Sequence, residues 1–136
     1  MARVIASDAP IHVRVPARPD FVRVLRAVAS SVAARGEMSF DAVEEIRIAV
    51  DEAATLMLGL RSDGAGTLAM SLEPFGNGLR ARITLTPGAI PRDPDELRTS
   101  WPWRVLAGLC DDVVFEPIAE HPSIRFMTRH EAGTPR

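Results

Sequence analysis

The stretch that decides the fold runs from residue 40 to residue 58 and reads Phe40-Asp-Ala-Val-Glu-Glu-Ile-Arg-Ile-Ala-Val-Asp-Glu-Ala-Ala-Thr-Leu-Met-Leu58. Its apolar residues recur at spacings of three and four, the period of a helix that packs one face on a core. Asp41, with Glu44 three residues later, has the form of a capping box, so the pattern predicts a helix that begins there. The stripe that should face the core comprises Val43, Ile46, Val50, Ala53, Met57 and Leu60.

The segments before this helix carry two further signals. Residues 11–15 alternate apolar and polar side chains, the period of a strand, and Pro16 ends the alternation. Asp20 can cap a second helix over residues 21–35, with Gly36 as its stop. The apolar stripe expected on that helix comprises Phe21, Val24, Leu25, Val28 and Val32.

Two strands are expected after the central helix. Residues 67–73 and 79–85 are rich in apolar residues, and the second segment alternates strictly between apolar and polar positions. The segment Phe75-Gly-Asn-Gly78 between them contains an Asn-Gly turn signal. We therefore predict an antiparallel hairpin.

The remainder of the chain completes the expected architecture. A loop is predicted over residues 86–100, a short helix over 101–109, and two strands near 113–117 and 123–128. The order β-α-α-β-β-α-β-β predicts an α+β fold: a two-layer sandwich with a mixed, mainly antiparallel sheet and helices on one face. We expect one domain over 1–136, with its core at about 10–130 and frayed ends.

Composition excludes several classes of function. All 16 basic residues are arginine, so phosphate-loop and Schiff-base lysines are excluded. One cysteine excludes an internal disulfide, and with three scattered histidines it offers no zinc-ligand spacing. A net charge of -2 gives no field for nucleic acid or anionic membrane. With no apolar run long enough to span a bilayer and no signal-peptide pattern, we expect a cytoplasmic protein.

The 40–58 segment resembles the N-box helix of anti-sigma factor serine kinases, which are GHKL (Bergerat-fold, histidine kinase-like) ATPases. Phe21-Val-Arg-Val24 and Cys110-Asp-Asp-Val-Val114 resemble the same family at the expected places, so the resemblance covers roughly residues 10 to 130. It is strongest to the divergent actinobacterial anti-sigma-F-like branch. In that branch a Ser-x-x-Trp-type segment, here Ser100 to Trp103, also precedes the third helix.

The resemblance assigns roles to two positions of the N-box helix. Glu52 matches the general base of active members, but Leu56 stands where an asparagine holds magnesium. Leucine offers no oxygen ligand to a hard cation. The only asparagine, Asn77, lies in the predicted hairpin turn, so no register restores the ligand. We expect no metal site.

Two further nucleotide boxes of the family are degraded. In the adenine-binding box Thr86 occupies the aspartate position, Gly88 remains, and Ile90 replaces the second glycine. The phosphate-binding Gly-x-Gly reads Ser100-Trp101-Pro102, and proline has no N–H to offer a phosphate. Loss of one such group costs about a hundredfold in rate, so the three losses together predict negligible kinase activity.

The resemblance implies a regulator that sequesters an RNA polymerase sigma factor, and an anti-anti-sigma protein that releases this factor by binding the regulator in its place. The expected protein is a homodimer without cofactor, direct nucleic-acid contact or membrane contact. Arg23 and Arg26 of the first helix are the expected partner-binding residues. The alternative is an active ATP-dependent protein serine kinase that binds ATP and magnesium through Asp51 or Glu52. A third possibility is a signalling module that shares the fold but binds no sigma factor.

Plainer interpretations stay open for the same residues. Glu52 can simply lie on a solvated helix face, and Arg23 can be an exposed arginine of an amphipathic helix. Trp101 and Trp103 can anchor a partner, but we expect at least one to pack in the core or fill the adenine space. Cys110 precedes two aspartates, which favours a buried, inert thiol over a redox sensor.

Overall fold

The computed structural model describes residues 9–61 and 65–128. The predicted frayed ends lie largely outside these residues. The elements, in chain order, are β1 (Ile11–Pro16), the 3-10 helix η2 (Pro19–Phe21), α1 (Val22–Arg35), α2 (Phe40–Leu58), β2 (Thr67–Phe75), β3 (Gly78–Thr86), α3 (Asp95–Arg98), α4 (Trp101–Leu109), β4 (Cys110–Phe115) and β5 (Ser123–Thr128).

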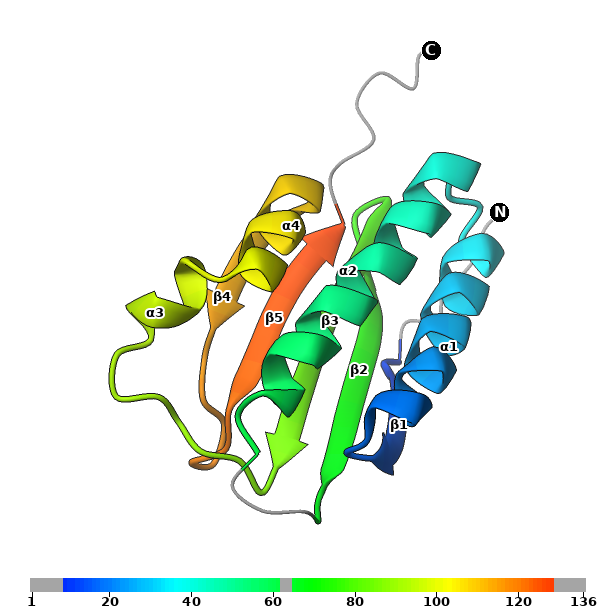
Figure 1. Ribbon diagram of the computed structural model, residues 1–136. Coiled ribbons are helices and arrows are strands. Elements are labelled where there is room, and N and C mark those ends of the chain that lie inside the picture. The colour runs from blue at the N-terminus through cyan, green and yellow to red at the C-terminus, as the bar shows by residue number, and fades with distance from the viewer. Residues whose placement is uncertain (1–8, 62–64, 129–136) are drawn as a thin grey trace.

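The five strands form one sheet in the order β1-β2-β3-β5-β4, and each neighbouring pair is antiparallel. Helices α1, α2 and α4 lie side by side over one face of this sheet (Figure 1). The α+β prediction is therefore confirmed, and the pairing is antiparallel throughout the described sheet rather than mixed. Among the residues that the structure describes, no helix lies on the other face of the sheet (Figure 1).

The core lies between the sheet and the helix layer. It is built from the strand side chains that face the helices and from the side chains on the inner sides of α1, α2 and α4. Its largest fully buried side chains include Leu25, Ile46, Met57, Ile83, Leu106 and Phe126. The predicted stripe of α2 is confirmed at Ile46, Val50, Ala53 and Met57, while Val43 and Leu60 pack at its margin.

The β2–β3 hairpin is confirmed, with a turn one residue earlier than the Asn-Gly signal. Phe75 is paired with Gly78, which leaves Gly76 and Asn77 as the two-residue loop. Gly76 has a φ of 61°, a conformation that glycine adopts without steric cost. A positive φ at the first of two loop residues is the pattern of a type II′ turn, which suits the twist of the hairpin.

Both predicted helix caps are wrong. The cap of α2 is Ser39, whose Oγ accepts a hydrogen bond from the Ala42 N–H at 3.1 Å, so Asp41 lies inside the first turn. Asp20 does not cap α1 either, because it lies within η2 and pairs with Arg18 at 3.2 Å. Pro19, with its fixed φ, starts the 3-10 turn before the α-helix can begin.

The buried side of α1 is rotated from the predicted stripe. Val24 is 38% exposed, whereas Ala29 and Ala33 are completely buried. Helices α1 and α2 pack against each other, and small side chains on the buried side of a helix allow such close packing. Gly36 follows α1 as predicted, but its φ is -82°, and the left-handed residue is Glu37.

The segment after the hairpin is more ordered than expected. The short helix α3 interrupts the predicted 86–100 loop, and Leu97 from it is buried. Strand β4 begins at Cys110, three residues before the predicted start at 113. The sequence pattern missed this start because a register shift between Asp111 and Val114 interrupts the alternation of side chains along the strand. No helix of residues 9–61 and 65–128 has the length and apolar character needed to cross a bilayer.

Candidate functional site

The carboxylates of α2 lie on its solvent-facing side. Asp51 Oδ1 accepts a hydrogen bond from Arg26 Nη1 of α1 at 2.5 Å, so this ion pair links the two helices. Glu52 is half-buried beside it. Partial burial, and then the neighbouring charge of Asp51, raise the pKa of Glu52 above its usual value of 4.5. The structure therefore gives the candidate base a higher proton affinity than an ordinary glutamate has.

Leu56, one turn beyond Glu52, belongs to the core. Its exposed fraction is 7%, and it lies in the same cluster as Met57 and Leu106. The position that the resemblance assigns to a magnesium ligand is thus occupied by a packed aliphatic side chain. A leucine in that place supplies hydrophobic stabilisation and no metal ligand.

The predicted adenine-box residues lie where β3 ends. Thr86 is exposed as the last residue of the strand, and the Thr86–Pro87 peptide bond is cis. A Cβ atom added to Gly88 would come within 2.7 Å of Leu85 Cδ2 and of Pro122 Cγ. The backbone N–H of Ala89 donates to the Leu60 carbonyl at 2.7 Å, which fastens this loop to the end of α2.

Gly88 therefore allows Leu85 and Pro122 to pack against the backbone at a point where a side chain would not fit. Sequence reasoning assigned it only to a nucleotide box, since Pro122 lies far along the chain and no local pattern indicates the contact. Thr86, by contrast, is exposed, and its backbone carbonyl lies close to Gly66, where an added Cβ atom would come within 2.9 Å of it.

The start of α4 explains the Ser-x-x-Trp segment. Ser100 Oγ accepts a long hydrogen bond of 3.4 Å from the Trp103 N–H and donates to the Leu97 carbonyl at 2.6 Å. Pro102 stands in the first turn. The segment thus acts as a helix cap, with proline at a position where a helix tolerates it.

The two tryptophans have different environments. Trp103 is buried in the core, and the Arg98 guanidinium lies 5.6 Å from its ring centroid. Trp101 is 71% exposed. The expectation that at least one tryptophan packs in the core is confirmed by Trp103, and Trp101 is the one available to a partner.

The residues at these positions do not fit a magnesium–nucleotide complex held as in active relatives. Leu56 offers no oxygen, and Pro102 offers no N–H where a phosphate would need one. Within residues 9–61 and 65–128, no three His, Cys, Asp or Glu side chains are grouped so that they could hold a metal ion.

The two candidate partner-binding arginines of α1 also differ. Arg23 is exposed and makes no ion pair within the described part of the chain, next to the half-exposed Val24. Arg26 is engaged by Asp51. Cys110, for which a buried thiol was expected, is indeed buried at the start of β4.

The chain shows sequence similarity to two curated proteins. It is 34% identical over 90 residues to the serine-protein kinase RsbW of Halalkalibacterium halodurans, a match that covers 66% of this chain and 54% of that protein. It is 42% identical over 45 residues to the serine-protein kinase RsbW of Bacillus subtilis, covering 33% of this chain and 28% of that protein. No protein-family model matches the chain.

The chain therefore spans about half the length of the first relative and less of the second. The similarity establishes homology with RsbW serine-protein kinases at modest identity. It agrees with the α+β sandwich and with the resemblance carried by the N-box helix.

Proposed function

We propose that this protein is an anti-sigma factor-like regulator that binds and sequesters a sigma factor of RNA polymerase in the cytoplasm. An anti-anti-sigma protein would release the sigma factor by competing for the same surface. The nucleotide site would be degenerate, and the chain would belong to the divergent actinobacterial anti-sigma-F-like branch. The observation that carries the proposal is the burial of Leu56 in the core, where an active homologue needs a magnesium ligand.

The outer side of α1 is the surface we assign to the competing partners. Arg23 is exposed, makes no ion pair in the described residues and has an exposed apolar neighbour, Val24. Arginine beside apolar surface is a common composition of protein interfaces. Arg26 would contribute only if a partner displaced Asp51 from it.

Affinity capture from the source cell tests this proposal. The tagged chain should retain a sigma subunit identified by mass spectrometry, and Arg23→Ala should lower the amount retained about tenfold, the effect of removing an interface arginine worth about 1.4 kcal/mol. Arg104→Ala, which removes an exposed arginine of α4, is the matched control and should retain the wild-type amount. Capture without any sigma subunit would contradict the proposal.

The second candidate function is an ATP-dependent protein serine kinase that phosphorylates an anti-anti-sigma partner. Two observations favour it: the homologues are named serine-protein kinases, and the raised pKa of Glu52 suits a general base. Such an enzyme would need Asp51 or Glu52 as a metal ligand in place of the missing asparagine.

Labelled ATP with magnesium distinguishes the two candidates. We expect no nucleotide binding and no phosphate on a candidate anti-anti-sigma protein. Serine phosphorylation that disappears in Glu52→Gln would instead establish the kinase. The homodimer belongs to the same proposal, and its mass by sedimentation equilibrium would test it separately from sigma binding.

A further inference from the structure

The face of the sheet opposite the helices carries two rows of side chains that run across the strands. Residues directly opposite each other in antiparallel strands share a face. The first row comprises His12, Ser71, Arg82 and Arg125, and the second comprises Arg14, Ala69, Thr84 and Ser123. Neither row contains an acidic residue. These eight residues are called the transverse rows below.

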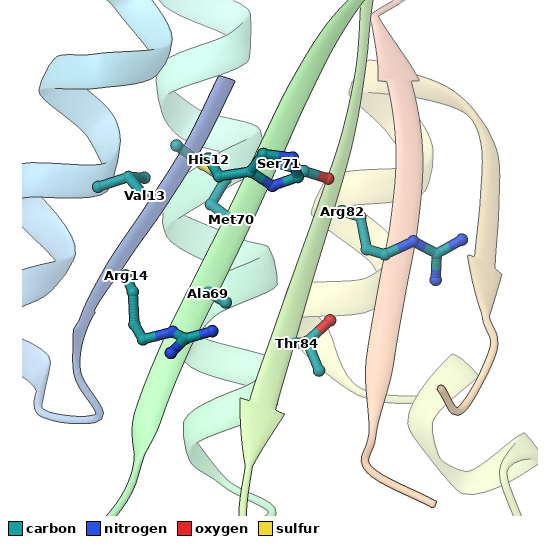
Figure 2. A pocket seen from close by; sticks show the side chains of 8 residues that line it. All are labelled: His12, Val13, Arg14, Ala69, Met70, Ser71, Arg82 and Thr84. Atoms are coloured by element: carbon teal, nitrogen blue, oxygen red, sulfur yellow. The ribbon is translucent and has the colours of Figure 1, made fainter. Parts of the chain in front are cut away.

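A hollow of about 450 Å³ lies on the β1–β2–β3 part of these rows. Its floor is made of small side chains, Ala69, Ser71 and Thr84, and basic side chains rise around it. In Figure 2 the guanidinium of Arg14 extends toward Ala69, while that of Arg82 extends over β5. The hollow is therefore a shallow basic depression with hydroxyl groups at its base.

The positive charge of the transverse rows is only partly balanced. Arg82 donates to Glu116 at 2.8 Å and to the Ser123 hydroxyl at 3.0 Å. Arg14 and Arg125 make no ion pair in the described residues, and Arg125 lies directly opposite Arg82, a like-charge pair that costs stability. Glu73, the nearest acidic residue on β2, pairs with Arg80 outside the rows.

The pKa of Glu116 is lowered by the same positive charge. The hydrogen bond and charge of Arg82, together with the charge of Arg125, lower the pKa of this exposed carboxyl below its usual value. A carboxylate from outside the chain would meet the same field over Arg14, and over Arg125, whose charge acts on Glu116 without an ion pair in the described residues.

The spacing of the rows suits an extended chain. Neighbouring strands lie about 4.8 Å apart, and Arg14 on β1 and Arg125 on β5 belong to different rows, two residues apart along the strands, so their backbones stand roughly 16 Å apart. An extended polypeptide advances about 3.3 Å per residue, so carboxylates about five residues apart can reach both guanidinium groups. The Ser71 hydroxyl between them can donate to a backbone carbonyl of the same segment, whereas the Thr84 hydroxyl already donates to Ser123 Oγ at 3.0 Å.

We propose that the transverse rows bind an acidic, extended segment of a partner protein. The segment would lie across the strands, with carboxylates on Arg14 and Arg125 and its middle in the hollow. A nucleic acid fits less well, since the rows contain no Phe, Tyr or Trp, and His12 is their single ring on which a base could stack. A second copy of this face would bring arginines toward arginines. This inference does not rest on the proposed function, because the face lies opposite α1.

Fluorescence anisotropy at low ionic strength tests the inference. The probe is a short labelled peptide of alternating glutamate and serine, with the glutamine version and single-stranded oligothymidylate as comparisons. Arg14→Ala should weaken binding of the glutamate peptide about tenfold, as expected for loss of one charge-assisted contact. Ser71→Glu, which puts a carboxylate on the floor of the hollow, should weaken it at least as much. Arg104→Ala should change it less than about twofold.

Several results would overturn the inference. One is binding that Arg104→Ala weakens as much as Arg14→Ala does, since the effect would then be one of net charge. Another is tighter binding of oligothymidylate than of the glutamate peptide. A third is a dimer in sedimentation equilibrium that Ser71→Glu dissociates, because the face would then be a self-association surface. If Ser71→Glu fails to fold by circular dichroism, Arg14→Ala decides alone, as Arg14 is exposed.

Discussion

Arg26 of α1 donates to Asp51 of α2 at 2.5 Å, and this ion pair connects the two helices on the solvent side of the helix layer. The side chains are 34% and 44% exposed, so water and salt screen the attraction. We expect a double-mutant cycle of Arg26→Ala and Asp51→Ala to give a coupling free energy of about 0.5 kcal/mol in urea unfolding. The Arg47–Glu44 pair within α2, at 3.5 Å, is the control and should couple less. A coupling above about 2 kcal/mol would show that the pair is effectively buried.

Glu52 should make stability depend on pH in a defined direction. Its folded-state pKa is raised, so the native chain holds this proton more tightly than the unfolded chain does. The associated stability is present below the usual value of 4.5 and is lost as pH rises through the folded-state pKa. Urea unfolding at several pH values measures this effect. The free energy of unfolding of Glu52→Gln should be close to that of wild type at acid pH and should exceed it increasingly as pH rises to neutral.

The cause of that shift can be tested separately. Asp51→Asn removes the neighbouring negative charge and should lower the pKa of Glu52 toward its usual value, measured by the NMR titration of its side-chain carboxyl carbon. An unchanged pKa in this variant would leave burial as the whole cause.

Leu56 provides a test of the degenerate site. Leu56→Asn restores the residue type of the family but buries an amide in an apolar cluster, so it should lower the free energy of unfolding by about 3 kcal/mol. Leu56→Met, which conserves volume, should cost less than about 1.5 kcal/mol. Calorimetry with ATP and magnesium should detect no binding to Leu56→Asn. Binding that the substitution creates would show that the rest of the pocket is intact.

Gly88 should be intolerant of a side chain for reasons of packing. Gly88→Ala would place a methyl group within 2.7 Å of Leu85 and Pro122, so we expect a loss of about 1–3 kcal/mol in urea unfolding. Gly108→Ala in α4 is the matched control, since nothing lies within 4 Å of its added Cβ, and it should stabilise by up to about 1 kcal/mol. Equal effects of the two substitutions would contradict this account.

The sequence predicted the order of the elements because hydrophobic periodicity is a local property. The alternation in residues 79–85 and the three-four spacing in α2 each specify an element and its buried side without knowledge of the neighbours. The cap of α2 could not be chosen in this way. Ser39 and Asp41 are both good caps, and only the backbone conformation at Ser39 decides between them.

The parts of the site that depend on contacts between distant segments were not predictable. Hydrophobicity ranks valine above alanine, so the pattern could not indicate that Ala29 and Ala33 are completely buried while Val24 is 38% exposed. The contact of Gly88 with Pro122 and the pair of Arg26 with Asp51 likewise join residues far apart in sequence. In contrast, the failure of Leu56 as a metal ligand followed from its chemistry alone.

The Ser100 cap has a consequence for how this fold could change over evolutionary time. The bare N–H groups at the start of a helix are the donors that a phosphate requires. In α4 the hydroxyl of Ser100 already takes the Trp103 N–H, and Pro102 contributes none. A variant that bound a phosphate at these N–H groups would have to give up a capping interaction of about 1 kcal/mol before the ligand compensated for it. On the proposal of a degenerate site, folding stability therefore opposes the restoration of this box.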